Sequence, residues 1–225
     1  MTAFAHHFNY ELRSGVRNRN LLLMNYLFPL GLYLMFGLFL TQVNPFFTAL
    51  MVPAMVTLAV MAATLLGLPD PLVSAREAGI LRSYKVNGVP NASVLLMPAL
   101  TTLVHMSIVA AIIVFTAPWL FDAAPPSNWG AFVLVYLALA LACSGLATLI
   151  GVVASSTRMT VLYSQLIFIP SMLLGGLMVP YEMLPEAAQR IARLLPATHG
   201  MNAFRALAMG MESEFNPWFS LAVLI

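Results

Sequence analysis

Long apolar runs without a single charged residue dominate the pattern of this chain. Four such runs, of 50, 36, 35 and 23 residues, lie between Arg19 and Asp70, Lys85 and Asp122, Asp122 and Arg158, and Arg158 and Glu182. A helix needs about 20 residues to cross the hydrocarbon core of a bilayer. The first run is long enough for two spans, with a turn-type break at Thr41-Gln-Val-Asn-Pro45, and each other run accommodates one.

We therefore expect five complete helical spans and the start of a sixth. The five cover residues 21–40, 46–69, 93–117, 131–154 and 159–178. The sixth begins near Pro217 and reaches Ile225. Nine helical residues rise only about 14 Å, so we expect this span to be truncated at residue 225.

Composition supports a membrane protein. The chain is 61% hydrophobic and 8% charged, whereas a soluble domain is about 25% charged. This excludes a soluble enzyme and a disordered chain, and a net charge of +2 is too small for nucleic-acid binding. The single cysteine, Cys143, excludes an intrachain disulfide and any multi-cysteine metal site. We expect an all-α membrane protein with one transmembrane domain over residues 1–225, in contact with membrane lipid.

Lysine and arginine alternate between successive loops, which predicts the orientation. The loops at 41–45 and 118–130 carry none. The basic segments are the N-terminal region with Arg13, Arg17 and Arg19, the 70–92 loop with Arg76, Arg82 and Lys85, and the 155–158 loop with Arg158. Cytoplasmic loops carry the excess of basic residues, so we expect a cytoplasmic N-terminus and a location in the cell membrane, as in a bacterial inner membrane.

An amphipathic helix is predicted over residues 1–20. Phe4, Phe8 and Leu12 recur at helical spacing, and the arginines lie off that stripe. Such a helix lies in the membrane interface, where it can serve either as an anchor or as a docking element for a partner.

The segment 179–216 lies on the outer side in this orientation. It departs from the rule that basic residues gather in cytoplasmic loops, because it carries three arginines. Within it, residues 185–195 place four apolar residues on one face, Ala188, Ile191, Ala192 and Leu195. This pattern predicts a short amphipathic helix that lies on the outer leaflet or dips into it.

The loop at 70–92 is the main polar segment between spans. Ser74 and Glu77 have the spacing of a capping box, which predicts a short helix that starts at Ser74. Gly88 and Pro90 end the segment. On composition, it is either a plain polar loop or a docking element on the cytosolic side.

Two stretches resemble ABC-2 type transporter permeases. One is Arg76-Glu77-Ala-Gly79-Ile-Leu81-Arg82 before Gly88-Val-Pro90, which is similar to the family's cytoplasmic loop. The other is Pro170-Ser-Met-Leu-Leu-Gly-Gly-Leu-Met-Val-Pro180 with the later Asn202-Ala-Phe-Arg205, which is similar to the fifth span and outer hairpin. The motifs occur in the family's order along nearly the whole chain.

The resemblance implies a six-span, type V exporter-like bundle with an outer re-entrant hairpin. It implies a permease subunit that pairs with a second one, as a homodimer, and exports a drug, lipid or glycan. ATP and Mg would bind a separate cytosolic ATP-binding cassette protein. The residues that the resemblance marks for coupling to that protein are Arg76, Glu77, Gly79, Leu81, Arg82 and Tyr84.

The residues themselves argue for an external source of energy. A phosphate-binding loop ends in Gly-Lys-Ser/Thr, but the single lysine, Lys85, follows Tyr84. The five spans contain no Asp, Glu, Lys or Arg, which disfavours ion coupling. The alternative is a secondary carrier or channel not driven by ATP. The histidines at 6, 7, 105 and 199 form no cluster, so we expect neither an enzyme nor a metal site.

Two polar residues within spans are candidates for the substrate pathway. His105 is the single mid-span histidine, and Gln165 lies in the fifth span. Each also fits a structural role, since polar side chains in membranes hydrogen-bond to neighbouring helices.

Overall fold

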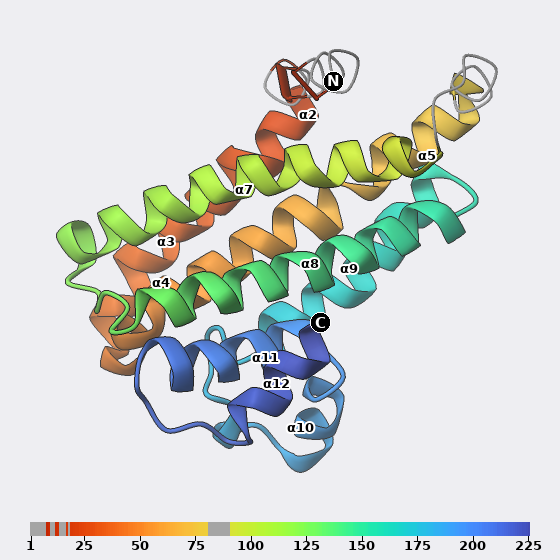
Figure 1. Ribbon diagram of the computed structural model, residues 1–225. Coiled ribbons are helices and arrows are strands. Elements are labelled where there is room, and N and C mark those ends of the chain that lie inside the picture. The colour runs from red at the N-terminus through yellow and green to blue at the C-terminus, as the bar shows by residue number, and fades with distance from the viewer. Residues whose placement is uncertain (1–7, 10–11, 14–16, 18, 81–90) are drawn as a thin grey trace.

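The computed structural model describes residues 8–9, 12–13, 17, 19–80 and 91–225, and these ranges are helical with short connections (Figure 1). The elements are α2 (Arg19–Leu22), η1 (Leu23–Leu27), α3 (Phe28–Val43), α4 (Pro45–Met61), η2 (Ala62–Leu66), α5 (Pro69–Glu77), α7 (Asn91–Phe121), α8 (Trp129–Val153), α9 (Thr157–Leu174), η3 (Tyr181–Met183), α10 (Glu186–Ala192), α11 (Pro196–Ala203), η4 (Phe204–Ala208) and α12 (Pro217–Leu224). Most of the amphipathic helix predicted over 1–20 lies outside the described residues.

Four helical stretches are long and apolar enough to cross a membrane. They are Leu23–Val43, Phe46–Glu77, Leu95–Phe121 and Trp129–Val153, and they run alongside one another in Figure 1. They correspond to the spans predicted at 21–40, 46–69, 93–117 and 131–154. The second stretch continues past its predicted end, because Pro69 is compatible with the first turn of a helix and starts α5 directly after η2.

The span predicted at 159–178 corresponds to α9, which is not one of these four stretches. Arg158 in its first turn and Gln165 in its middle lower its mean hydropathy. A fifth and a sixth span, and one domain over 1–225, therefore stay predictions.

Helix α4 is the centre of the bundle, whereas α3 lies at its edge. In the most apolar stretch of the span Phe46–Glu77, 89% of the residues are buried, against 22% for Leu23–Val43. α4 packs on α3, α7, α8 and α11, so it contacts protein on every side. A helix that is apolar all round fits such a position.

Two π-helical segments, η1 and η2, pack against each other. Asn25 of η1 is 3% exposed, and its Oδ1 lies 3.1 Å from the point where a side chain on Gly67 would begin. Wide π turns of this kind are frequent at functional sites.

Residues 175–225 form a helical layer at one end of the bundle, which we call the C-terminal cap (Figure 1). α11 packs on α4, α8, α9 and α12. The backbone N–H groups of Ser127 and Asn128, in the α7–α8 connection, both donate to the Ala208 carbonyl. The segment 179–216 is thus a packed part of the fold.

The amphipathic helix predicted at 185–195 is present as α10, which ends at Ala192. Ala192 is buried and Ile191 is 52% exposed, so the apolar face at Ile191 turns away from the rest of the protein, and its contact with the outer leaflet stays a prediction. Adjacent helical residues point about 100° apart. The face that packs on α9 is centred on Ala192, and it leaves Ile191 outside.

Candidate functional site

The α5 end of the bundle comprises α5 and the turn between α8 and α9. The predicted capping box is wrong, because α5 begins at Pro69 and Leu68 occupies the N-cap position without a side-chain hydrogen bond. Ser74 lies inside the helix, and its carbonyl accepts a hydrogen bond from Ala78 N–H. Helix α5 is therefore a continuation of the second apolar stretch and not a separate loop helix.

Helix α5 packs closely on α8. Leu72 and Val73 are buried, and a Cβ on Gly151 of α8 would lie 2.9 Å from Leu72 Cδ1. Any larger residue at 151 would push the two helices apart. The contact between α5 and α8 thus depends on a glycine.

Arg76 joins α5 to the turn that connects α8 and α9. Its Nη1 donates to the Val152 carbonyl at 2.8 Å, and its Nη2 donates to the Ala154 carbonyl. These carbonyls belong to the C-terminus of α8, where a positive charge is favoured by the helix dipole. The guanidinium is therefore engaged within the chain, and it ties α5 to the C-terminal end of α8.

Glu77 and Gly79 lie at the exposed end of α5. Both are exposed, and Ile80 next to them is 42% exposed. Gly79 has φ of +72°, a left-handed conformation that ends the helix and that other residues adopt at a cost. Leu81, Arg82 and Tyr84, also predicted to couple to a partner, lie outside the described residues. The structure thus places Arg76, Glu77 and Gly79 at one tip.

His105 is a buried residue of α7 that joins neighbouring segments. Its Nδ1 lies 2.6 Å from Tyr26 Oη, and the residue is 3% exposed. Its Nε2 is buried without a hydrogen-bond partner among the described residues. These contacts fit the structural role that the sequence left open.

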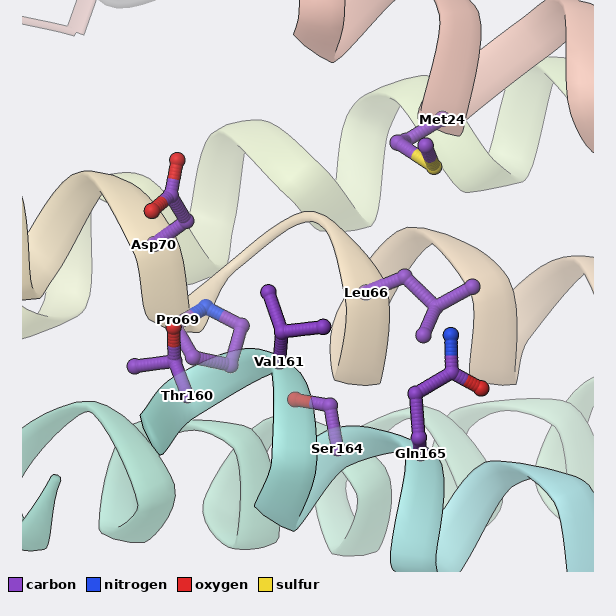
Figure 2. A pocket seen from close by; sticks show the side chains of 8 residues that line it. All are labelled: Met24, Leu66, Pro69, Asp70, Thr160, Val161, Ser164 and Gln165. Carbon is purple, nitrogen blue, oxygen red and sulfur yellow. The ribbon is translucent and has the colours of Figure 1, made fainter. Parts of the chain in front are cut away.

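Gln165 lines a cavity of about 120 Å³ below α5 (Figure 2). Thr160, Val161, Ser164 and Gln165 of α9 form one wall, and the other residues come from η1, η2 and α5: Met24, Leu66, Pro69 and Asp70. His105 is not among the lining residues, so the structure does not bring the two pathway candidates together in this cavity.

Asp70 is the lining residue that the sequence analysis missed. It lies in the first turn of α5, and its Oδ1 is buried without a hydrogen-bond partner among the described residues. In the sequence it served only as the boundary of a charge-free run. An acidic residue directly after a proline at the end of a span was the signal available.

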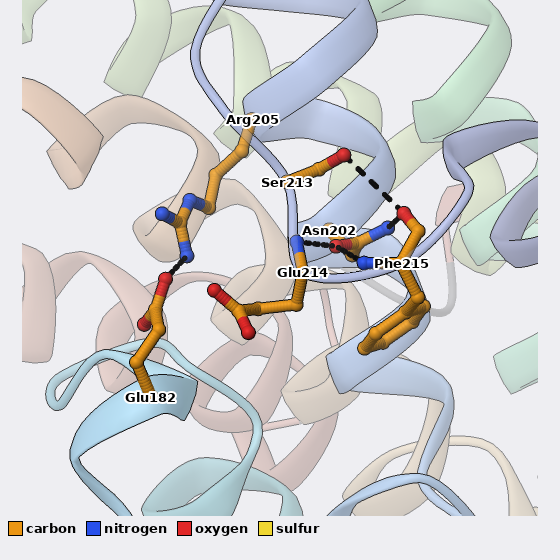
Figure 3. A network of polar contacts seen from close by, with 6 residues as sticks. All are labelled: Glu182, Asn202, Arg205, Ser213, Glu214 and Phe215. Atoms are coloured by element: carbon orange, nitrogen blue, oxygen red, sulfur yellow. Dashed lines mark hydrogen bonds and ion pairs between the residues drawn. The ribbon is translucent and has the colours of Figure 1, made fainter.

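Asn202 is the polar centre of the C-terminal cap (Figure 3). Its Nδ2 donates to the Phe215 carbonyl at 2.8 Å and to Ser220 Oγ at 3.0 Å. Its Oδ1 accepts from the N–H groups of Glu214 at 3.0 Å and Phe215 at 3.5 Å. The amide thus holds the connection before α12 against α11.

Arg205 and two carboxyl groups lie beside this amide. Arg205 Nη1 donates to Glu182 Oε1 at 2.9 Å. A hydrogen bond to Glu182 is the main cause that raises the pKa of Glu214, followed by burial. Burial acts to raise the pKa of Glu182, but the hydrogen bonds from Glu214, its own backbone and Arg205 outweigh it and lower that pKa. The pair therefore favours a shared proton.

The described residues contain no group of three or more His, Cys, Asp or Glu side chains arranged to hold a metal ion. The polar groups at both ends of the bundle are suited to binding and positioning.

A family model described as ABC-2 type transporter matches residues 2–209. Nodulation protein J of Neorhizobium galegae is 31% identical over 87 residues, which cover 37% of this chain and 33% of that protein. Nodulation protein J of Rhizobium meliloti is 31% identical over 70 residues, covering 31% and 27%. The matched regions thus span about a third of these relatives or less. No solved structure matches the chain.

Proposed function

The chain belongs to the ABC-2 type transporter family, and we propose that it is the membrane-spanning permease subunit of an ATP-driven exporter. It is a multi-pass membrane protein and a transporter component. The family match over residues 2–209 is the observation that carries this proposal. The sequence of residues 1–225 contains no Gly-Lys-Ser/Thr, which supports the proposal that ATP and Mg bind a separate cytosolic subunit.

The α5 end is the cytoplasmic end in this proposal. α2, the end of α5 and the α8–α9 turn lie at the same end of the bundle in Figure 1. These segments carry Arg19, Arg76 and Arg158, whereas the α3–α4 and α7–α8 connections at the opposite end carry no Lys or Arg. The positive-inside rule then directs the α5 end to the cytosol.

Helix α5 is the element that transmits the partner's motion. Its exposed tip presents Glu77 and Ile80, and its other face is packed on α8 and α9 through Leu72 and Arg76. A push on the tip therefore acts on two long helices at once. ATP binding by the cytosolic subunit would supply that push, and Gly79 would let the chain turn away after the helix.

The transported molecule is hydrophobic or amphiphilic, of the drug, lipid or glycan class. The apolar runs support this assignment, since the four charge-free segments of the sequence offer no charged residue to a hydrophilic ion. Export as the direction follows from the family resemblance. A second copy of the chain completes the pathway, and membrane lipid surrounds the exposed apolar faces of α3 and α8.

Glu77→Ala tests this proposal in a reconstituted complex with the ATP-binding subunit that co-purifies with the chain. We expect the variant to lose most of the stimulation of ATP hydrolysis while it retains the thermal unfolding temperature of the wild type. Glu186→Ala is the matched control, because Glu186 is an exposed carboxylate in the C-terminal cap. Normal stimulation by a folded Glu77→Ala variant would remove Glu77 from the coupling site, and the absence of any co-purifying ATP-binding protein would contradict the ATP-driven function.

A further inference from the structure

We propose that the cavity below α5 binds a primary ammonium group carried by an amphiphilic molecule. The cavity is formed by η1, η2, α5 and α9, and it lies apart from the exposed tip with Glu77 (Figure 2). The proposal concerns binding alone and does not rest on the permease function.

The charge of the cavity calls for a cationic ligand. Asp70 is the single ionisable residue among the lining side chains. The ion pairs within the described residues join Arg190 to Glu186 and Arg205 to Glu182, so they leave Asp70 without a basic partner. Arg76 on the same helix is engaged by the α8 carbonyls. Asp70 is half-buried, and its Oδ1 is a buried atom without a partner among the described residues, so a cationic ligand would satisfy an oxygen that solvent does not reach.

The polar atoms of the cavity favour a ligand with N–H donors. Asp70 Oδ1 is a buried acceptor without a partner. Ser164 is 3% exposed and lines the cavity, and its hydroxyl makes no hydrogen bond with the described residues. Thr160 donates to the Thr157 carbonyl at 2.6 Å, so its hydroxyl oxygen retains acceptor capacity. A primary ammonium group has three N–H donors, and the oxygens of Asp70, Ser164 and Thr160 are acceptors that the cavity offers to such donors.

The remaining walls fit the apolar part of an amphiphile. Met24, Leu66, Pro69 and Val161 are the apolar lining residues, and the amide of Gln165 is the remaining polar group. A water molecule needs about 10–15 Å³ of such space, so the 120 Å³ of this cavity accommodates a head group of several heavy atoms. A bare Ca²⁺ or Mg²⁺ ion would require about six or more oxygen ligands, which a largely apolar wall does not supply.

Calorimetric titration of the purified chain in phosphatidylcholine nanodiscs tests the proposal. These lipids carry no N–H donor on their head groups. The probes are decylamine, decanol and decyltrimethylammonium at neutral pH, corrected for their uptake by empty nanodiscs. We expect decylamine to bind about tenfold more tightly than the other two, which corresponds to about 1.4 kcal/mol.

Variants assign the binding to the cavity. Asp70→Asn should weaken decylamine binding about tenfold, the size expected for one lost charge-assisted hydrogen bond. Asp122→Asn is the matched control, because Asp122 is an exposed carboxylate in the α7–α8 connection. Ser164→Ala should weaken binding by about threefold, in proportion to a neutral hydrogen bond.

Unchanged affinity in a folded Asp70→Asn variant, or equal affinity for decanol, would overturn the proposal. If Asp70→Asn does not fold, unchanged affinity in Ser164→Ala overturns it. Repeating the titration with phosphatidylethanolamine in the nanodiscs distinguishes two sources of the ammonium group. Weaker decylamine binding there identifies a lipid head group, and unchanged binding identifies a separate amphiphile. Because the assay contains neither ATP nor a partner protein, its failure would leave the permease proposal intact.

Discussion

The central polar groups of the C-terminal cap and of the α5 end differ in how they are satisfied. In the cap, the amide of Asn202 makes four hydrogen bonds, to backbone and side-chain atoms before and within α12. At the α5 end, Asp70 Oδ1 and Ser164 line a cavity without hydrogen bonds to the described residues. Asn202 is thus held in place, whereas the α5 cavity keeps acceptors available. The cap also holds two buried atoms without partners among the described residues, Thr198 Oγ1 and Arg205 Nε, so the difference concerns these central groups.

This difference indicates where the chain has room to respond. An unsatisfied buried polar atom costs about 1–3 kcal/mol, so a fold that retains one is more stable when a ligand satisfies it. Arg76 is the polar link between α5 and α8, because its hydrogen bonds to described residues go to the backbone carbonyls of Val152 and Ala154. We therefore expect substitutions in the cap to act on stability and substitutions at the α5 end to act on function.

The largest effect on stability is expected for Asn202→Ala. The substitution removes four hydrogen bonds and leaves the N–H groups of Glu214 and Phe215 without partners, while the Phe215 carbonyl keeps the bond from Ser213 Oγ at 3.2 Å. We expect a loss of about 2–4 kcal/mol in the free energy of unfolding, measured by denaturant titration in detergent micelles. Asn216→Ala is the control, since it removes one capping bond to Trp218 N–H at the start of α12 and should cost about 1 kcal/mol. Equal losses in the two variants would contradict a central role for Asn202.

Arg76→Ala is expected to lower stability less than Asn202→Ala does, but to have a larger effect on function. Arg76→Ala removes the cap on the α8 carbonyls and should cost about 1–2 kcal/mol, while it lowers the stimulation of the ATP-binding subunit several-fold. Arg76→Lys keeps the charge but cannot span two carbonyls as a guanidinium does, so it should restore stability more than coupling. Full coupling in Arg76→Ala would show that the α8–α9 turn is not on the path from α5.

The spans could be predicted from the sequence, because segments that lie in lipid contain long runs without charged residues. It did not identify the contacts that set the sites, since these join distant positions. Tyr26 and His105 are 79 residues apart, and Arg76 reaches carbonyls at 152 and 154. The sequence pattern predicts that a span ends at Pro69 and that Asp70 lies in a loop. In the structure, Pro69 occupies the first turn of α5, and Asp70 is part of that helix.

The smallest effect is expected from the carboxyl pair in the cap. The raised pKa of Glu214 adds stability that is present below its ordinary value of 4.5 and is lost as the pH rises through the folded value. The lowered pKa of Glu182 adds stability above 4.5 that is lost as the pH falls through its folded value. The pair thus stabilises the cap most near pH 4.5.

Glu214→Gln isolates this dependence, because glutamine donates to Glu182 at every pH. Between pH 4.5 and 7.5 the unfolding temperature of the variant should rise relative to the wild type by less than about 2 °C, since both groups are largely exposed. A difference that stays constant with pH would show that the two carboxyl groups do not share a proton.

Cross-linking in native membranes tests most directly whether the α5 end docks the ATP-binding subunit. The chain has one cysteine, and Cys143 is buried, so Cys143→Ala provides a background without thiols. Into this background are placed Glu77→Cys at the tip of α5 and Glu186→Cys in the cap, both at exposed positions. We predict that a thiol cross-linker joins the Glu77→Cys variant to a protein with a Gly-x4-Gly-Lys-Ser/Thr sequence, identified by mass spectrometry, and that the Glu186→Cys variant gives no such product. The same product from Glu186→Cys, with none from Glu77→Cys, would contradict the account.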